Sequence, residues 1–128
     1  MDITIIPDKN KNTISSYGVE GFKVKETNYK KTLLLNANWL DEIDIYSLKE
    51  LENVGLSELG SVINQQTEIL LIGSGSKHLP LSSDFRQQVK KLYPFLSINE
   101  MTSAAACRTY NILVAEERIA SAILLPIT

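Results

Sequence analysis

The chain has 128 residues, the size of one ordinary domain and enough to bury a core without a disulfide or structural metal. Hydrophobic residues make up 44% and charged residues 22%, and the formal net charge is −2 with both signs mixed along the chain. No basic stripe appears, which argues against nucleic acid as a partner. One cysteine cannot form an internal disulfide. We therefore expect a globular protein of a reducing compartment, the cytoplasm.

The first residues, Met-Asp-Ile-Thr-Ile-Ile-Pro, have neither the basic segment nor the apolar core of a secretory signal. The longest apolar stretch, residues 119–127, is interrupted and far too short to cross a bilayer. We expect no membrane-spanning segment.

The first 46 residues resemble a series of short strands. Ile3 and Ile5 alternate with polar neighbours, as do Phe22 and Val24, which is the period of a half-buried strand. The continuous apolar run in residues 32–35 predicts a strand that is covered on both faces.

Three helices are expected in the second half. The first carries an apolar stripe and is capped by Ser57. The second begins at Ser82 or Ser83, and the third at Thr102 or Ser103. The apolar residues of the first stripe are Leu56, Leu59, Val62 and Ile63, and those of the second are Phe85, Val89 and Leu92.

Strands are predicted between these helices at residues 68–72, 97–100 and 119–125. Both faces of the last strand are apolar or small, so we expect it in the middle of the sheet. Alternation of strands and helices with short links predicts the α/β class, with a parallel or mixed sheet covered by helices.

A glycine-rich loop, Gly73-Ser74-Gly75, follows one predicted strand and precedes a helix. Backbone N–H groups in such a loop can hold an anion. The third glycine of a dinucleotide-binding fingerprint is missing, and no Gly-Lys-Ser/Thr follows. A tight structural turn is therefore favoured over a ligand loop.

Arg108 lies in the second turn of the last helix, where a cation opposes the helix dipole. We expect the side chain to be partly buried and held either by a carboxylate or carbonyl groups of this same chain or by a bound anion. Neighbouring Cys107 is interpreted as a small buried core residue, because a nucleophilic thiol needs a base and the only histidine, His78, lies in another segment. Thr109, Tyr110 and Asn111 could line a pocket, but packing of Tyr110 on the sheet with its hydroxyl bonded, and bonds from Asn111 to nearby backbone, are favoured.

Metal binding and catalysis have little support in the sequence. One histidine and one cysteine do not make a ligand set, and no acid–base pair is apparent. We expect no cofactor, no metal and no enzymatic activity.

Five segments together resemble a known family, and they span nearly the whole chain from about Ile14 to Pro126. They are Ser16-Tyr-Gly18, Gly21-Phe-Lys-Val24, Leu33-Leu-Leu35, Ile69-Leu-Leu-Ile-Gly-Ser-Gly75 and Ala105-Ala-Cys-Arg-Thr-Tyr-Asn111. The chain resembles a family of small α/β proteins described as a domain of unknown function. That family includes the mitochondrial complex I (NADH dehydrogenase) alpha-subcomplex assembly factor three.

The resemblance implies a single domain over residues 1–128, with a central mixed sheet, flanking helices and an extra N-terminal β layer. It implies no catalytic residues. Glu117 stands where the family has glycine after the last helix, so we expect that helix to end without a left-handed cap. The segment Lys77-His-Leu-Pro80 also lacks the family's glutamine.

Two functions follow from the sequence. The first is a non-enzymatic binding or assembly protein with a protein partner and possible self-association, similar to complex I assembly factors. The alternative is a small-molecule or anion-binding protein, or an unrecognised enzyme. Its cleft would lie between the glycine loop and the last helix, with Gly73, Ser74, Gly75, Arg108 and Asn111 as candidate ligand-binding residues.

Overall fold

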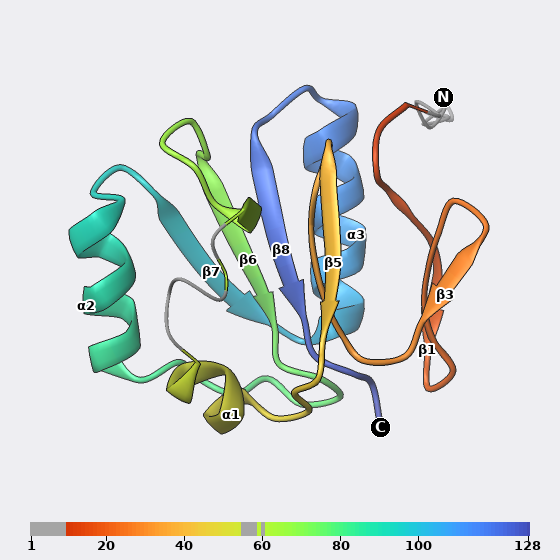
Figure 1. The fold of residues 1–128 in the computed structure, drawn as a ribbon, viewed down its shortest axis with the longest axis horizontal. Helices are drawn as coiled ribbons and strands as arrows, with labels where there is room; N and C mark the ends of the chain where they lie inside the picture. The colour runs from red at the N-terminus through yellow and green to blue at the C-terminus, as the bar shows by residue number, and fades with distance from the viewer. Residues whose placement is uncertain (1–9, 55–58, 60) are drawn as a thin grey trace, which may run out of the picture.

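A computed structural model describes residues 10–54, 59 and 61–128 of the chain. These residues form eight strands and three helices, and five of the strands make up a central sheet (Figure 1). The strands are β1 (Ile14–Gly18), β2 (Gly21–Val24), β3 (Thr27–Tyr29), β4 (Thr32–Asn36), β5 (Trp39–Ile43), β6 (Ile69–Gly73), β7 (Ser97–Met101) and β8 (Ala120–Leu124). The helices are α1 (Leu48–Asn53), α2 (Ser83–Leu92) and α3 (Ser103–Ala115).

The central sheet is mixed, in the order β5-β4-β8-β6-β7. Strand β6 pairs in parallel with β7 and β8, whereas β4 pairs antiparallel with β5 and β8. Strand β8 is therefore in the middle and is buried along its whole length, which confirms the prediction for residues 119–125.

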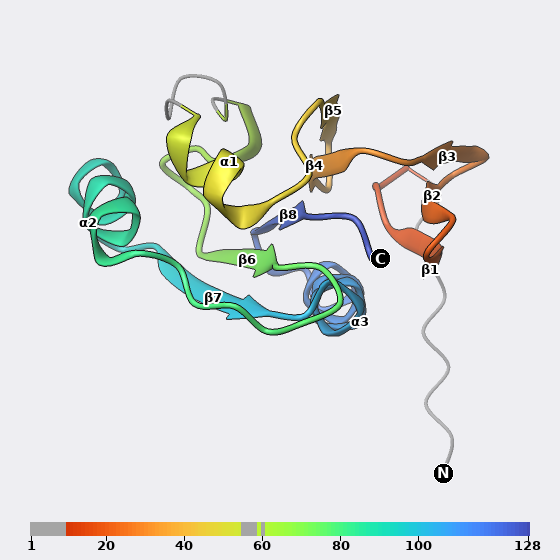
Figure 2. The same ribbon diagram turned by 90° about the horizontal axis from the view of Figure 1, so that it is seen from below.

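The two faces of the sheet are covered by different elements (Figure 2). Leu34 points toward the face that carries α1 and α2, while Leu33 and Leu35 point toward α3, as the two-residue period of a strand requires. Ile123 and Ala122 of β8 divide between the same two faces. The domain thus has two hydrophobic clusters on either side of one sheet.

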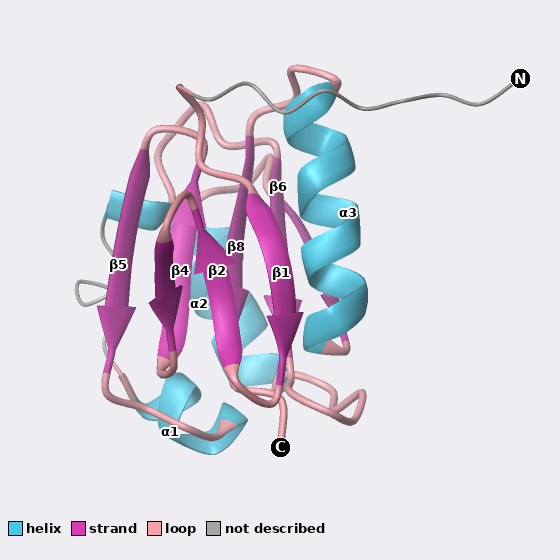
Figure 3. Cartoon of the chain, turned by 90° about the vertical axis from the view of Figure 1, so that its right-hand side faces the viewer, coloured by secondary structure: helices cyan, strands magenta, loops and turns pink. Residues whose placement is uncertain are grey.

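A separate three-stranded antiparallel sheet, β1-β2-β3, packs beside α3 (Figure 3). Phe22 and Val24 are fully buried in the α3-side cluster, so their alternation was interpreted correctly. The fold class is confirmed: a single α/β domain with a central mixed sheet, flanking helices and an extra β layer.

The helix starts follow capping rules. The side chain of Ser82 accepts a hydrogen bond from the Phe85 N–H at 3.2 Å, and Thr102 accepts one from the Ala105 N–H at 3.3 Å. Helix α1 was not predicted, although Ser47 and Glu50 have the spacing of a capping box. The Ser47 hydroxyl accepts a hydrogen bond from the Glu50 N–H and donates one to the Glu50 carboxylate.

One predicted helix is not found in the described residues. Leu59, Val62 and Ile63 lie in the core as their stripe requires, but residues 59, 61 and 62 form a short 3₁₀ turn. The carbonyl of Val62 accepts hydrogen bonds from the side chains of Asn36 and Ser121, which take the place of helical bonds. Predictions on Ile3, Ile5, Leu56 and Ser57 fall outside the described residues.

The end of α3 corrects another expectation. Glu117 adopts a left-handed conformation with φ 61°, although it is not glycine. Its N–H donates to the carbonyl of Val114 and the Arg118 N–H donates to that of Leu113, which is the Schellman arrangement. These two bonds and the docking of the next strand hold the strained residue in place.

Candidate interaction site

The glycine loop is a close junction between β6 and the start of α3. The N–H of Gly75 donates to the Ser103 hydroxyl at 2.9 Å, and that hydroxyl donates to the Leu125 carbonyl at 2.6 Å. Ser103 is fully buried, and a Cβ added to Gly73 would lie 2.7 Å from the Ser103 Cα. Glycine is therefore required at position 73 by close packing.

Ser74 is also bonded within the protein. Its N–H donates to the Met101 carbonyl at 2.9 Å, while its hydroxyl donates to the Lys77 carbonyl and accepts from the Leu79 N–H. The N–H groups of Ser74 and Gly75, which an anion would need, thus have protein acceptors. This arrangement supports the structural-turn interpretation of the loop.

Arg108 lies on the solvent side of α3, so the expectation that it is partly buried is wrong. Its guanidinium donates to the hydroxyl of Tyr17 in β1 at 3.0 Å. Strand β1 runs alongside the helix (Figure 3), which brings these distant residues together. The described residues form three ion pairs, and Arg108 is in none of them.

Asn111 holds β1 against α3. Its side-chain oxygen accepts from the Ile14 N–H and its amide donates to the Ile14 carbonyl, both at 2.8 Å. The buried Tyr110 hydroxyl donates to the Asn12 carbonyl at 2.8 Å. Both residues thus bond nearby backbone, as favoured from the sequence, and they fix the strand that carries Tyr17.

Cys107 is fully buried and is not part of a disulfide. Burial raises the pKa of its thiol from 9.0 to about 12, against the smaller opposing effect of the Arg108 charge. His78 is exposed on the loop after β6. Because a nucleophile acts as the thiolate, Cys107 is poorly suited to covalent catalysis at neutral pH.

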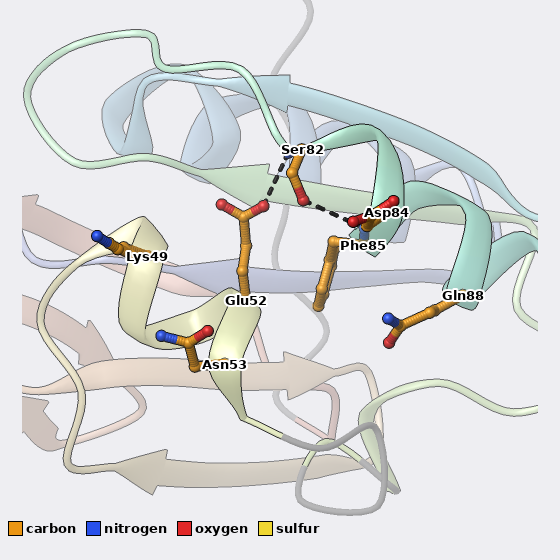
Figure 4. A pocket seen from close by; sticks show the side chains of 7 residues that line it. All are labelled: Lys49, Glu52, Asn53, Ser82, Asp84, Phe85 and Gln88. Atoms are coloured by element: carbon orange, nitrogen blue, oxygen red, sulfur yellow. Dashed lines mark hydrogen bonds between the residues drawn. The ribbon is translucent and has the colours of Figure 1, made fainter.

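A polar groove of about 320 Å³ lies between α1 and α2 (Figure 4). Glu52 reaches across it to accept a hydrogen bond from the Ser82 N–H at 2.8 Å. No local pattern in the sequence marks this groove, because the groove depends on how two helices meet. Its lining residues are Lys49, Glu52, Asn53, Ser82, Asp84, Phe85 and Gln88.

The candidate residues thus lie in three separate places. Gly73, Ser74 and Gly75 belong to the buried junction, Asn111 to the contact with β1, and Arg108 to the outer surface of α3. Tyr17 was not recognised as a site residue, since only the packing of β1 on α3 reveals it. We define the Arg108 surface as Tyr17, Arg108 and Ile112, because Ile112 is 45% exposed one helical turn beyond Arg108.

Neither a metal site nor a membrane-spanning helix is found in residues 10–54, 59 and 61–128. No group of three or more His, Cys, Asp or Glu side chains in these ranges could hold a metal ion. None of the helices described is long and apolar enough to cross a bilayer.

Solved structures share this fold. An outer membrane protein from Bartonella henselae superimposes with a TM-score of 0.75 and 27% identity, covering 94% of this chain and 98% of that chain. A Bordetella pertussis protein with an Mth938-like domain gives a TM-score of 0.77 at 19% identity, covering 98% of this chain and 92% of that chain. At that lower identity the likeness shows the fold alone.

A sequence relative extends the comparison. The "13 kDa major membrane protein" of Francisella tularensis is 33% identical over 101 residues, which is 76% of each chain. The family model described as "Protein of unknown function (DUF498/DUF598)" matches residues 14–125. With all but the outermost residues matched, the chain belongs to the DUF498/DUF598 family.

Proposed function

We propose that this protein is a non-enzymatic binding or assembly protein of the cytoplasm, and that a protein partner binds the Arg108 surface. The observation that carries the proposal is an exposed guanidinium with a neutral hydroxyl neighbour and no ion pair among the described residues. A cation near a helix N-terminus gains nothing from the helix dipole. Arg108 therefore contributes little to the fold and is available to an acidic partner.

The composition of the surface also suits a protein partner. Arginine and tyrosine are enriched at the residues that dominate protein–protein binding energies. Ile112 adds an exposed apolar side chain beside Arg108. The hydrogen bond that the guanidinium donates to the Tyr17 hydroxyl orients it before binding, which lowers the entropy lost when the complex forms.

The names of two relatives suggest a membrane setting for the partner. The sequence resembles complex I assembly factors, and the Francisella and Bartonella relatives carry names that include a membrane protein. We propose that the partner is a subunit of a membrane-associated complex, bound while it is being assembled.

A binding experiment tests the proposal. Affinity capture from the native cell should recover a protein with the wild-type chain, and Arg108→Ala should reduce its recovery at least about tenfold, as for a central interface residue. Arg108→Lys should restore binding only in part, because lysine lacks the planar donor fork. Arg118→Ala, an exposed cation beyond the other end of α3, is the matched control and should bind normally.

The competing ligand is a small anion. If the wild type retains a metabolite that Arg108→Ala loses, and no protein is captured, that result would favour the anion-binding function over a protein partner. Equal protein recovery with all three variants would remove the Arg108 surface from the interface.

A further inference from the structure

We propose that this protein also attaches peripherally to an anionic lipid surface, through the corner where α2 turns into β7. We define the α2–β7 corner as Lys90, Lys91, Leu92 and Phe95. It is separate from the Arg108 surface, so either proposal can fail without the other.

The corner exposes apolar side chains on an ordered turn. Phe95 is 96% exposed, the largest exposure among the large hydrophobic residues described, and Leu92 is 52% exposed. The sequence predicted Leu92 on the buried face of α2, but it lies in the last position of the helix, past the core. The N–H groups of Tyr93 and Leu96 donate to the carbonyls of Val89 and Tyr93, so the turn is hydrogen-bonded.

Two lysines accompany these apolar residues. Lys90 and Lys91 form the last turn of α2, and both are exposed. The Lys90 ammonium donates to the Leu96 carbonyl at 2.5 Å, which holds its charge at the corner. Neither lysine belongs to any of the three ion pairs among the described residues. At a membrane surface, the apolar side chains of this corner could enter the acyl-chain region while the neighbouring lysine ammonium groups contact the lipid phosphates.

The geometry favours lipid over a protein partner. The corner is a turn at the edge of the molecule (Figure 1), and the groove between α1 and α2 lies at the other end of α2. Two side chains on such a turn offer far less contact area than the roughly 800 Å² per partner of a standard protein interface. A lipid interface needs no complementary pocket and can take up an isolated phenylalanine.

Attachment through this corner should be weak and oriented. The whole chain carries a net charge of −2, so attraction to an anionic surface depends on local groups of cations such as the two lysines of this corner. Glu116 and Glu117 are exposed at the turn between α3 and β8, and their carboxylates are repelled by an anionic lipid surface, which keeps that turn away from it. Attachment should therefore depend strongly on salt.

Vesicle flotation with the full chain tests the proposal. At low ionic strength the wild type should float with vesicles of phosphatidylcholine and phosphatidylglycerol. The double variant Leu92→Ser/Phe95→Ser should bind at least about tenfold more weakly, because the apolar area is lost. Lys91→Gln should weaken binding to these vesicles by about fivefold and leave binding to pure phosphatidylcholine unchanged.

Matched controls separate the corner from general stickiness. Val19→Ser removes another exposed apolar residue, and Lys77→Gln another exposed cation, and both should float like the wild type. Circular dichroism checks that each variant is folded. Failure of the wild type to float, or equal flotation of the folded double variant, overturns the proposal. A protein partner lost with the double variant, without any flotation by the wild type, would reassign the corner to protein binding.

Discussion

The inner and outer sides of α3 use polar residues in opposite ways. On the inner side, the Ser103 hydroxyl forms hydrogen bonds with two buried backbone groups, and Cys107 is buried in the core. On the outer side, Arg108 touches one neutral hydroxyl and faces solvent. Neighbouring residues of one sequence block therefore serve different purposes. Polar groups with all their bonds inside the protein stabilise the fold, and those with spare bonding capacity are available to a partner.

The largest effect is expected from Gly73→Ala on the inner side. Its Cβ would lie 2.7 Å from the Cα and the hydroxyl oxygen of Ser103, so β6 and α3 must move apart. We expect a loss of about 3 kcal/mol or more in the free energy of unfolding, measured with urea. Gly18→Ala is the control, since nothing lies within 4 Å of that added carbon. Similar losses for both variants would show that the junction is not tight.

Ser103→Ala should have the next largest effect. The change leaves the Gly75 N–H and the Leu125 carbonyl without their buried hydroxyl partner. We expect a loss of about 2 kcal/mol in the free energy of unfolding. Ser15→Ala, which removes an exposed hydroxyl bonded to the Lys23 carbonyl, should cost about 0.5 kcal/mol or less. A loss for Ser103→Ala as small as this would mean that water replaces the hydroxyl.

Cys107 gives the inner side a dependence on alkaline pH. Because burial raises the pKa of the folded thiol from 9.0 to about 12, the unfolded chain releases this proton first. The Cys107 thiol makes its full contribution to the free energy of unfolding below about pH 9. That free energy should then fall by roughly 1.4 kcal/mol per pH unit between about pH 9 and about pH 12. Cys107→Ala should flatten that slope in urea titrations between pH 8 and 10.5. Rapid labelling of the native thiol at neutral pH would contradict the burial.

The end of the helix offers a stabilising change. Glu117 is held at φ 61°, a conformation that glycine adopts without strain. We expect Glu117→Gly to raise the free energy of unfolding by about 1 kcal/mol, because the two capping bonds to Leu113 and Val114 are kept. Glu116→Gly is the control and should not stabilise, since Glu116 has a negative φ. No gain for Glu117→Gly would show that the side chain offsets the strain.

The smallest effect on stability is expected on the outer side. Arg108→Ala removes an exposed side chain, so the free energy of unfolding should change by about 0.5 kcal/mol or less. Its effect belongs to partner binding. A loss of 2 kcal/mol or more in urea unfolding would instead make the Tyr17 contact part of the fold, and the distinction between the two sides of α3 would disappear.

Several candidate residues were chosen correctly for reasons the sequence contains. Ser82 and Thr102 cap their helices, and each is one of the two adjacent hydroxyl residues predicted for that role, because a hydroxyl before a helical stripe can accept from the first N–H groups. The apolar faces of residues 119–125 predicted a central strand, and the strand Ala120–Leu124 is central and buried. Cys107 was predicted to be buried because a free cysteine without a neighbouring base is most often a core residue, and it is buried. These are local patterns, and each depends on only a few neighbouring residues.

Partnerships between distant segments could not be predicted in this way. Tyr17 meets Arg108 across 91 positions, and Asn111 meets Ile14 across 97. The Val62 carbonyl meets side chains from β4 and β8, which replaces the expected helix by a 3₁₀ turn. Such contacts depend on how whole helices and strands pack against one another, and no local sequence pattern specifies that packing.

The sequence by itself determined the class of the fold, the family and the buried character of β8, because periodicity and burial are properties of short segments. Only the tertiary structure decided that the glycine loop is filled by Ser103, that Arg108 faces solvent, and that Leu92 and Phe95 form an exposed corner. The physical reason is that exposure and hydrogen-bond partners depend on what packs against a residue. That information lies in the arrangement of segments far apart along the chain.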